Sequence, residues 1–199
     1  QQTKIMVLAL KHLDKEQVRK SPELRSYIDK ALASVQGTRD YLDLVETYEL
    51  TNQNDALITM AGNNLESELG TEALGMALRM GGDKKITSKI QQTDTTEAIA
   101  WVQALGRVNS NESRNFLKPM ITNSSENLAV RKAAIASLGS GGWGGENQLL
   151  DMVKNGQIPA ELKETAAQHL AQAVNIPLSL LAIKSRLLND QVEYLCYCD

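Results

Sequence analysis

Hydrophobic side chains recur every three or four positions through most of the chain, which is the spacing of amphipathic α-helices. In the stretch 128–138 a row of mostly small side chains shares one helix face, whereas Arg131 and Lys132 point elsewhere. Because small side chains let a neighbouring helix come close, we predict a packed helix that ends at Gly139, where left-handed backbone is least costly. The row consists of Val130, Ala133, Ala134, Ser137 and Leu138.

The same periodicity predicts further helices, and polar, glycine or proline positions separate them. Charged residues 14–21, which end at Pro22, are predicted to form a connection. Asp55 is a plausible N-cap, and Asp94 with Glu97 resembles a capping box. Gly106 is expected to end the helix that Asp94 opens. The predicted ranges are 3–13, 23–35, 39–48, 56–63, 71–80, 84–90, 95–105, 113–121 (with Pro119 as a kink or an earlier start), 146–154, 160–174 and 178–188; only 192–197 reads as extended.

Three of these helix pairs follow one another at nearly constant spacing. Leu105-Gly106 recurs 33 positions later as Leu138-Gly139, and Leu170 follows Leu138 by 32 positions. Such a period is typical of α-solenoids. We therefore expect one domain over 1–190, with irregular helical pairs over 20–93 and regular repeats over 94–188. Residues 191–199 are expected to be a frayed tail or a linker.

Ankyrin and tetratricopeptide units have a similar length, but their sequence patterns are absent here. Val130-Arg131, the alanine run and Leu138-Gly139 resemble a HEAT-like repeat. The fold class that this resemblance implies is all-α, an α-solenoid of HEAT-like antiparallel helix pairs that is irregular in its N-terminal half.

Composition agrees with packed helices. Hydrophobic residues make up 42% of the 199 residues and aromatic residues only 4%, which disfavours a β-sandwich. The net charge of −3 lacks the basic excess of most nucleic-acid binders. No apolar run reaches the roughly 18 residues of a membrane span. The run 5–10 is also too short and too closely followed by charges for a signal peptide.

A wider resemblance covers roughly residues 20–188. The segments 37–45, 69–73 and 149–167 look like the helical-repeat region of large cell-envelope proteins of planctomycetes, verrucomicrobia and Bacteroidetes. In that family the region follows a β-propeller dehydrogenase-like domain and precedes a c-type cytochrome domain. The resemblance implies a periplasmic or envelope location and haem c in a neighbouring domain, with no cofactor in this chain; without it, we would expect a cytoplasmic protein. Cys196 and Cys198 have the wrong spacing for haem attachment.

Gly139, Gly141 and Gly144 spell Gly-x-Gly-x-x-Gly. Since a helix rather than a strand precedes them, we interpret them as a flexible interhelical turn instead of a dinucleotide loop. Trp143 within this turn either anchors a partner at the surface or folds back over the helix ends, and we favour the second interpretation.

Four basic residues, Arg107, Lys118, Arg131 and Lys132, could line one side of the superhelix and hold an acidic partner; the alternative, which we favour, is a solvated face. His169 lies on an apolar helix face and is expected to pack in the core. His12 has no sequence partner for a metal site, and the cysteine pair could bind metal or oxidise but more simply marks a frayed end.

Residues 111–113 and 123–125 match glycosylation sequons, which would be meaningless in a bacterial chain. No grouping of Ser, His and acid, and no pair of carboxylates in an apolar context, predicts catalysis. The leading hypothesis is a non-catalytic scaffold for a protein partner or for neighbouring domains of the same polypeptide. The alternatives are the helical part of an envelope oxidoreductase and, against the charge, a HEAT-like nucleic-acid binder.

Overall fold

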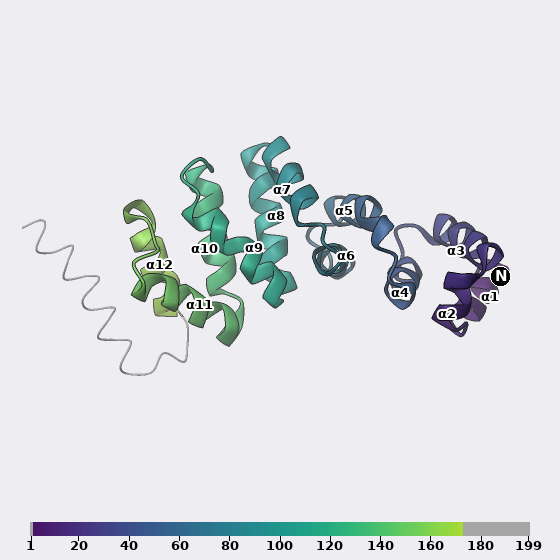
Figure 1. The fold of residues 1–199 in the computed structure, drawn as a ribbon. Coiled ribbons are helices and arrows are strands. Elements are labelled where there is room, and N and C mark those ends of the chain that lie inside the picture. Colours follow the sequence, from purple (N-terminus) through teal and green to yellow (C-terminus); the bar gives the residue numbers. More distant parts are fainter. Residues whose placement is uncertain (1, 173–199) are drawn as a thin grey trace, which may run out of the picture. The chain divides into compact units, whose positions relative to one another are not determined.

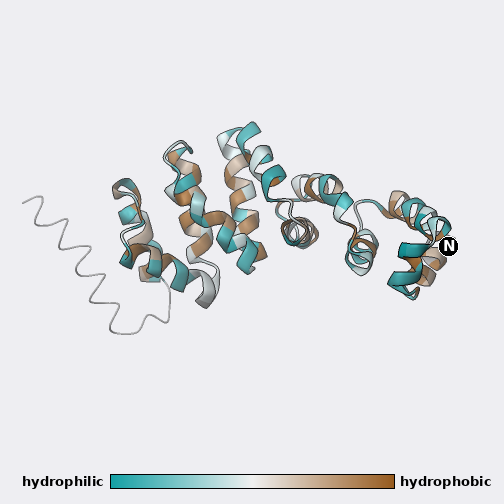
Figure 2. Ribbon diagram, viewed as in Figure 1, coloured by the Kyte–Doolittle hydropathy of each residue, from teal (hydrophilic) through white to brown (hydrophobic). Residues whose placement is uncertain are grey.

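A computed structural model describes residues 2–172, except for the side chains of residues 2–4 and of Trp143. In that part of the chain there are twelve α-helices, two short 3₁₀ turns and no strand, so the all-α prediction is confirmed. Figure 2 shows that most helices carry both hydrophobic and hydrophilic residues, as amphipathic packing requires. The predictions for 178–188, 192–197, Cys196 and Cys198 lie outside the described residues.

Packing divides the chain into two compact units, Gln1–Ser88 and Lys89–Asp199, with the boundary inside α7. In the first unit α1 packs against α3 and α4, α2 against α3, α3 against α4, α4 against α6, and α5 against α6. Its elements are α1 (Gln2–Lys11), α2 (Lys15–Lys20), α3 (Pro22–Val35), α4 (Arg39–Tyr48), η1 (Thr51–Gln53), α5 (Asn54–Gly62), α6 (Glu68–Arg79) and the start of α7 (Asp83–Gln92).

In the second unit α10 is the central helix, because it packs against α8, α9, α11 and α12. Helices α8, α10 and α12 lie side by side in chain order (Figure 1). The elements are α8 (Thr95–Val108), α9 (Asn111–Thr122), α10 (Leu128–Gly139), α11 (Gly142–Lys154), η2 (Ala160–Leu162) and α12 (Lys163–Gln172). The largest fully buried side chains of this unit are Trp101, Leu105, Leu117, Ile121 and Ile135.

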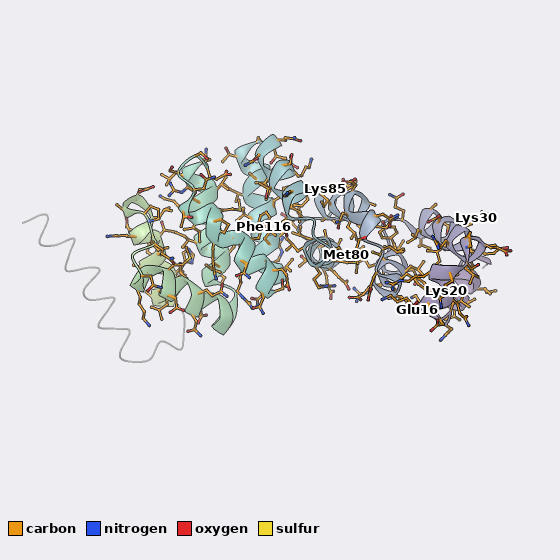
Figure 3. All side chains as sticks on the ribbon, in the orientation of Figure 1. Glu16, Lys20, Lys30, Met80, Lys85 and Phe116 are labelled. Atoms are coloured by element: carbon orange, nitrogen blue, oxygen red, sulfur yellow. The ribbon has the colours of Figure 1, made fainter. Side chains whose placement is uncertain are left out.

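The predicted connection 14–21 is wrong, because most of it forms the short helix α2. The Asp14 side chain accepts hydrogen bonds from the backbone N–H groups of Glu16 and Gln17 and so caps this helix. Val18 is buried, while Glu16 and Lys20 are exposed (Figure 3). One buried valine and a good cap thus suffice for a single helical segment that periodicity alone does not detect.

Several predicted helix starts are also wrong, among them that of α11, which begins at Gly142 and not at residue 146. Helix α5 begins at Asn54, so Asp55 lies inside its first turn and is not the N-cap. Helix α6 begins at Glu68, three residues before the predicted start, because the Ser67 hydroxyl accepts a hydrogen bond from Gly70 N–H. Asp94 caps α8 as predicted, at 2.9 Å from the Glu97 nitrogen.

Of the two glycines that were expected to end helices, Gly106 does not, and Gly139 does so without the expected left-handed backbone. Helix α8 continues through Gly106 to Val108, and the residue in the left-handed conformation is Asn109, with φ of 47°. Gly139 is the last helical residue of α10 and is not among the positive-φ residues of the chain. Both positions lack a side chain because another helix lies against them, as described below.

Candidate functional site

Arg131, one of the four basic residues predicted for an interaction surface, is buried. Its side chain is only 5% exposed, whereas that of Glu161, its ion-pair partner, is 49% exposed. The guanidinium Nε donates to the backbone oxygen of Ile121 near the end of α9, at 3.0 Å, and one Nη donates to Glu161 at 2.8 Å. Arg131 therefore ties α9, α10 and η2 together and is not available to a partner.

The row of small side chains predicted a single buried face for this helix, and Arg131 lies outside that row. A helix that packs against four others is buried over most of its circumference, so a residue beside the apolar row is also covered. The Glu161 carboxylate stays at the surface, and its pKa is lowered by its own backbone N–H and by the Arg131 guanidinium.

The other three basic candidates lie on three different helices of the second unit. Arg107 on α8 and Lys132 on α10 are exposed. Lys118 on α9 is half-buried and lies 3.4 Å from the Asn115 side-chain oxygen. These three residues remain candidates for a basic surface, which no longer includes Arg131. The Trp143 side chain lies outside the described residues, although its backbone is in the first turn of α11.

The glycine-rich segment is a tightly packed junction between helices and not a loop that cradles phosphates. A Cβ on Gly145 would lie 2.1 Å from the backbone oxygen of Leu138. A Cβ on Gly144 would meet the Arg114 guanidinium at 3.0 Å, and one on Gly141 would meet the Asn109 side-chain oxygen at 2.9 Å. Protein atoms therefore occupy the space beside each of these glycines.

Arg114, which sequence reasoning did not single out, organises this junction. Its guanidinium donates to the backbone oxygen of Asn109 at 2.9 Å, to the Asn109 side chain at 2.7 Å and to the Asn111 side chain at 2.8 Å. These bonds fasten the start of α9 to the turn that precedes it. The Arg114 guanidinium lies beside Gly144, so the same side chain also reaches the first turn of α11.

His169 was expected to pack in the core, but it is only half-buried. Its Cβ lies 3.1 Å from the position that a Cβ on Gly139 would take, so the glycine makes room for it against α10. Burial lowers the pKa of its imidazole below 6.5. His12 is exposed just after α1. Among the described residues no group of three or more His, Cys, Asp or Glu side chains could hold a metal ion.

The asparagines of both sequons, Asn111 and Asn123, are exposed. Ser113 is fully buried and forms the capping box of α9 with Ser110, so the 111–113 sequon is part of a helix end. Asn123 is exposed, and its side-chain oxygen accepts hydrogen bonds from the backbone and the hydroxyl of Ser125.

A charged cluster in the first unit was missed from the sequence. Lys11 at the end of α1 lies 2.9 Å from Asp40 and 2.6 Å from Asp43, both on α4. The hydrogen bonds with Asp43 and then with Asp40 raise the pKa of the Lys11 ammonium. Asp40 and Asp43 are 29 and 32 positions from Lys11, so a search for opposite charges about one repeat apart could have found the cluster.

The described residues contain no helix with the length and apolarity needed to cross a membrane. Comparisons with family models, curated proteins and solved structures found no match for this chain.

Proposed function

We propose that this chain is a non-catalytic helical-repeat scaffold, an α-solenoid of HEAT-like helix pairs that holds a protein partner or neighbouring domains of the same polypeptide. The observation that carries the proposal is the equivalence of two glycines one period apart. Gly106 of α8 lies against Ser137 of α10, and Gly139 of α10 lies against His169 of α12. The same motif position thus makes the same kind of close contact with the next helix of the series.

Polar contacts support the same period in both units. The Lys11–Asp43 hydrogen bond spans 32 positions, the Arg39–Glu72 contact spans 33, and the Arg131–Glu161 hydrogen bond spans 30. Side chains about one repeat apart are therefore neighbours in the first unit as well, although the hydrophobic period drifts there. Contacts of this kind are expected when each helix pair packs mainly on the next one.

A stack of helix pairs presents an extended surface whose side chains can vary without loss of the core. This favours a binding role over a catalytic one. Nucleic acid is the less favoured partner because the net charge is −3. The envelope location and a haem c domain elsewhere in the polypeptide follow only from the family resemblance and stay predictions.

The partner-binding role can be tested with the whole chain immobilised and exposed to an extract of its own cells. We expect the triple variant Arg107→Glu, Lys118→Glu and Lys132→Glu to lose a partner protein that the wild type retains. The reason is that charge reversal at these three positions repels an acidic partner that contacts them.

The matched control reverses three exposed lysines elsewhere, Lys20, Lys84 and Lys154, and should retain the partner. Equal retention by both triple variants would contradict the proposed basic surface. Retention of nucleic acid that falls steeply with salt would instead favour the nucleic-acid alternative.

A further inference from the structure

Glu49 adopts a backbone conformation that glutamate normally avoids. It follows α4 with φ of 49° and ψ of 51°, in the left-handed region. Helices commonly end at such a residue, which is usually glycine because a Cβ is unfavourable in this region. The other non-glycine residue with positive φ in the described part of the chain is Asn109, and asparagine tolerates the conformation. The reason for a glutamate at this position therefore lies in its side chain.

The Glu49 carboxylate pairs with two basic residues of α2. One oxygen contacts the Lys15 ammonium, and the other lies 3.3 Å from the Arg19 guanidinium. Lys15 and Arg19 are four positions apart, so they share one face of α2. The hydrogen bond from Lys15 lowers the pKa of the Glu49 carboxyl, which stays ionised at neutral pH. A charge that glycine would lack thus joins the end of α4 to α2.

Few buried contacts hold α2 in place. Val18 is the only buried residue of its six, and Asp14 caps its N-terminus. The helix packs against α3, where Arg25 donates to the Arg19 backbone oxygen. Because isolated helices shorter than about 12 residues are marginal in water, the tertiary contacts of α2 determine how often it opens.

We propose that Glu49 is an electrostatic clasp for α2 and that ionic strength loosens it. At low salt the two ion pairs hold α2 against the end of α4. The three side chains are exposed or partly exposed, so salt reaches them. The Debye length falls from about 30 Å at about 0.01 M salt to about 3 Å at about 1 M, and α2 then opens more often by local unfolding. The clasp is a feature of the first unit alone and does not depend on the scaffold role.

The test follows hydrogen exchange of the Val18 and Ser21 amides, which donate to the backbone oxygens of Asp14 and Gln17. In the wild type we expect the protection of both amides to fall about fivefold between about 0.01 M and about 1 M sodium chloride, since two exposed ion pairs are worth roughly that factor. Glu49→Gln and Glu49→Gly should show the lower protection already at low salt, and added salt should not reduce it further.

The two variants separate the clasp from the helix end. Glu49→Gln keeps the side chain and removes the charge. Glu49→Gly relieves the unfavourable backbone conformation and should leave α4 intact, because glycine is the usual residue at such a position. If Glu49 only ended α4, Glu49→Gly would protect α2 at least as well as the wild type does, and that result would overturn the proposal.

Glu46→Gln is the matched control. Glu46 lies on the same helix and is 62% exposed, against 61% for Glu49, but it pairs with Arg79 of α6. It should leave the α2 amides as in the wild type at both salt concentrations. Three results would contradict the clasp: wild-type protection that salt does not change, the same salt effect in Glu49→Gln, or an equal loss in Glu46→Gln.

Discussion

Gly106 on α8 lies directly against Ser137 on α10. A Cβ on Gly106 would be 2.7 Å from the Ser137 Cβ and 3.0 Å from its Cα, closer than two carbon atoms approach. The contact explains why glycine occupies a helix interior, where it costs about 1 kcal/mol relative to alanine. It also fixes the distance between two helices whose sequences share the Leu-Gly motif.

Gly106→Ala should therefore destabilise the protein although alanine favours the helix. Overpacking costs about 1–3 kcal/mol, which the propensity gain of about 1 kcal/mol offsets only in part. We expect a net loss of up to about 2 kcal/mol in the free energy of unfolding, measured by urea denaturation.

Two comparisons make this prediction specific. The loss should shrink in a Ser137→Gly background, because that change removes the nearest atom. Gly139→Ala should cost less than Gly106→Ala, because the nearest atom there, the His169 Cβ, is at 3.1 Å. A more stable Gly106→Ala protein would show that the two helices are not in close contact.

The buried Arg131 side chain leads to a second prediction. Arg131→Ala leaves the Ile121 backbone oxygen without its donor and opens a cavity, so we expect a loss of about 2–4 kcal/mol in thermal or urea unfolding. Lys132→Ala, at the neighbouring exposed position, should change the stability by about 0.5 kcal/mol or less. Similar effects of the two changes would mean that Arg131 is a surface residue after all.

The helices could be predicted from the hydrophobic periodicity, because each row of apolar side chains marks the face along which that helix packs. The N-cap Asp94 was also recognisable, since its hydrogen bond reaches only three residues along the chain. The second hydrogen bond of the expected capping box would run from the backbone N–H of Asp94 to the Glu97 side chain. The Glu97 carboxylate instead accepts from the Trp101 indole at 3.4 Å and lies near Lys89.

Features that depend on distant residues could not be found in this way. Whether Gly106 ends a helix or admits a neighbour is decided by Ser137, far away in the chain. The burial of Arg131 depends on Glu161 and on the end of α9. In both cases the local pattern predicted the commonest role of the residue, a helix end for the glycine and a surface position for the arginine. Contacts with the next repeat determined the role that the residue has in the structure.

The half-buried imidazole of His169 predicts a dependence of stability on acid pH. Its pKa is lowered in the folded protein, so at pH values below the unfolded value of 6.5 the unfolded chain binds the proton more readily. The stabilisation is complete above pH 6.5 and is lost as the pH falls toward the folded pKa. His169→Leu should flatten the profile of Tm between pH 7.5 and pH 5.

The Lys11 cluster predicts that the stability of the protein falls as the pH rises in the alkaline range, whereas the His169 effect makes the stability rise with pH. Hydrogen bonds with Asp43 and Asp40 raise the pKa of Lys11 above 10.5 in the folded protein. The folded state then holds a proton that the unfolded chain releases, so the stabilisation is complete below pH 10.5 and is lost as the pH rises through the folded pKa.

Lys11→Met should therefore lower the stability at pH 7 by about 1 kcal/mol or less, the range of partly exposed ion pairs. The difference between the variant and the wild type should narrow as the pH rises above 10.5. The measurement is urea denaturation at pH 7 and pH 11, with Lys84→Met at an exposed position of α7 as the control. A difference that is the same at both pH values would indicate that Lys11 acts through its methylene groups and not through its charge, because packing of the aliphatic stem does not titrate.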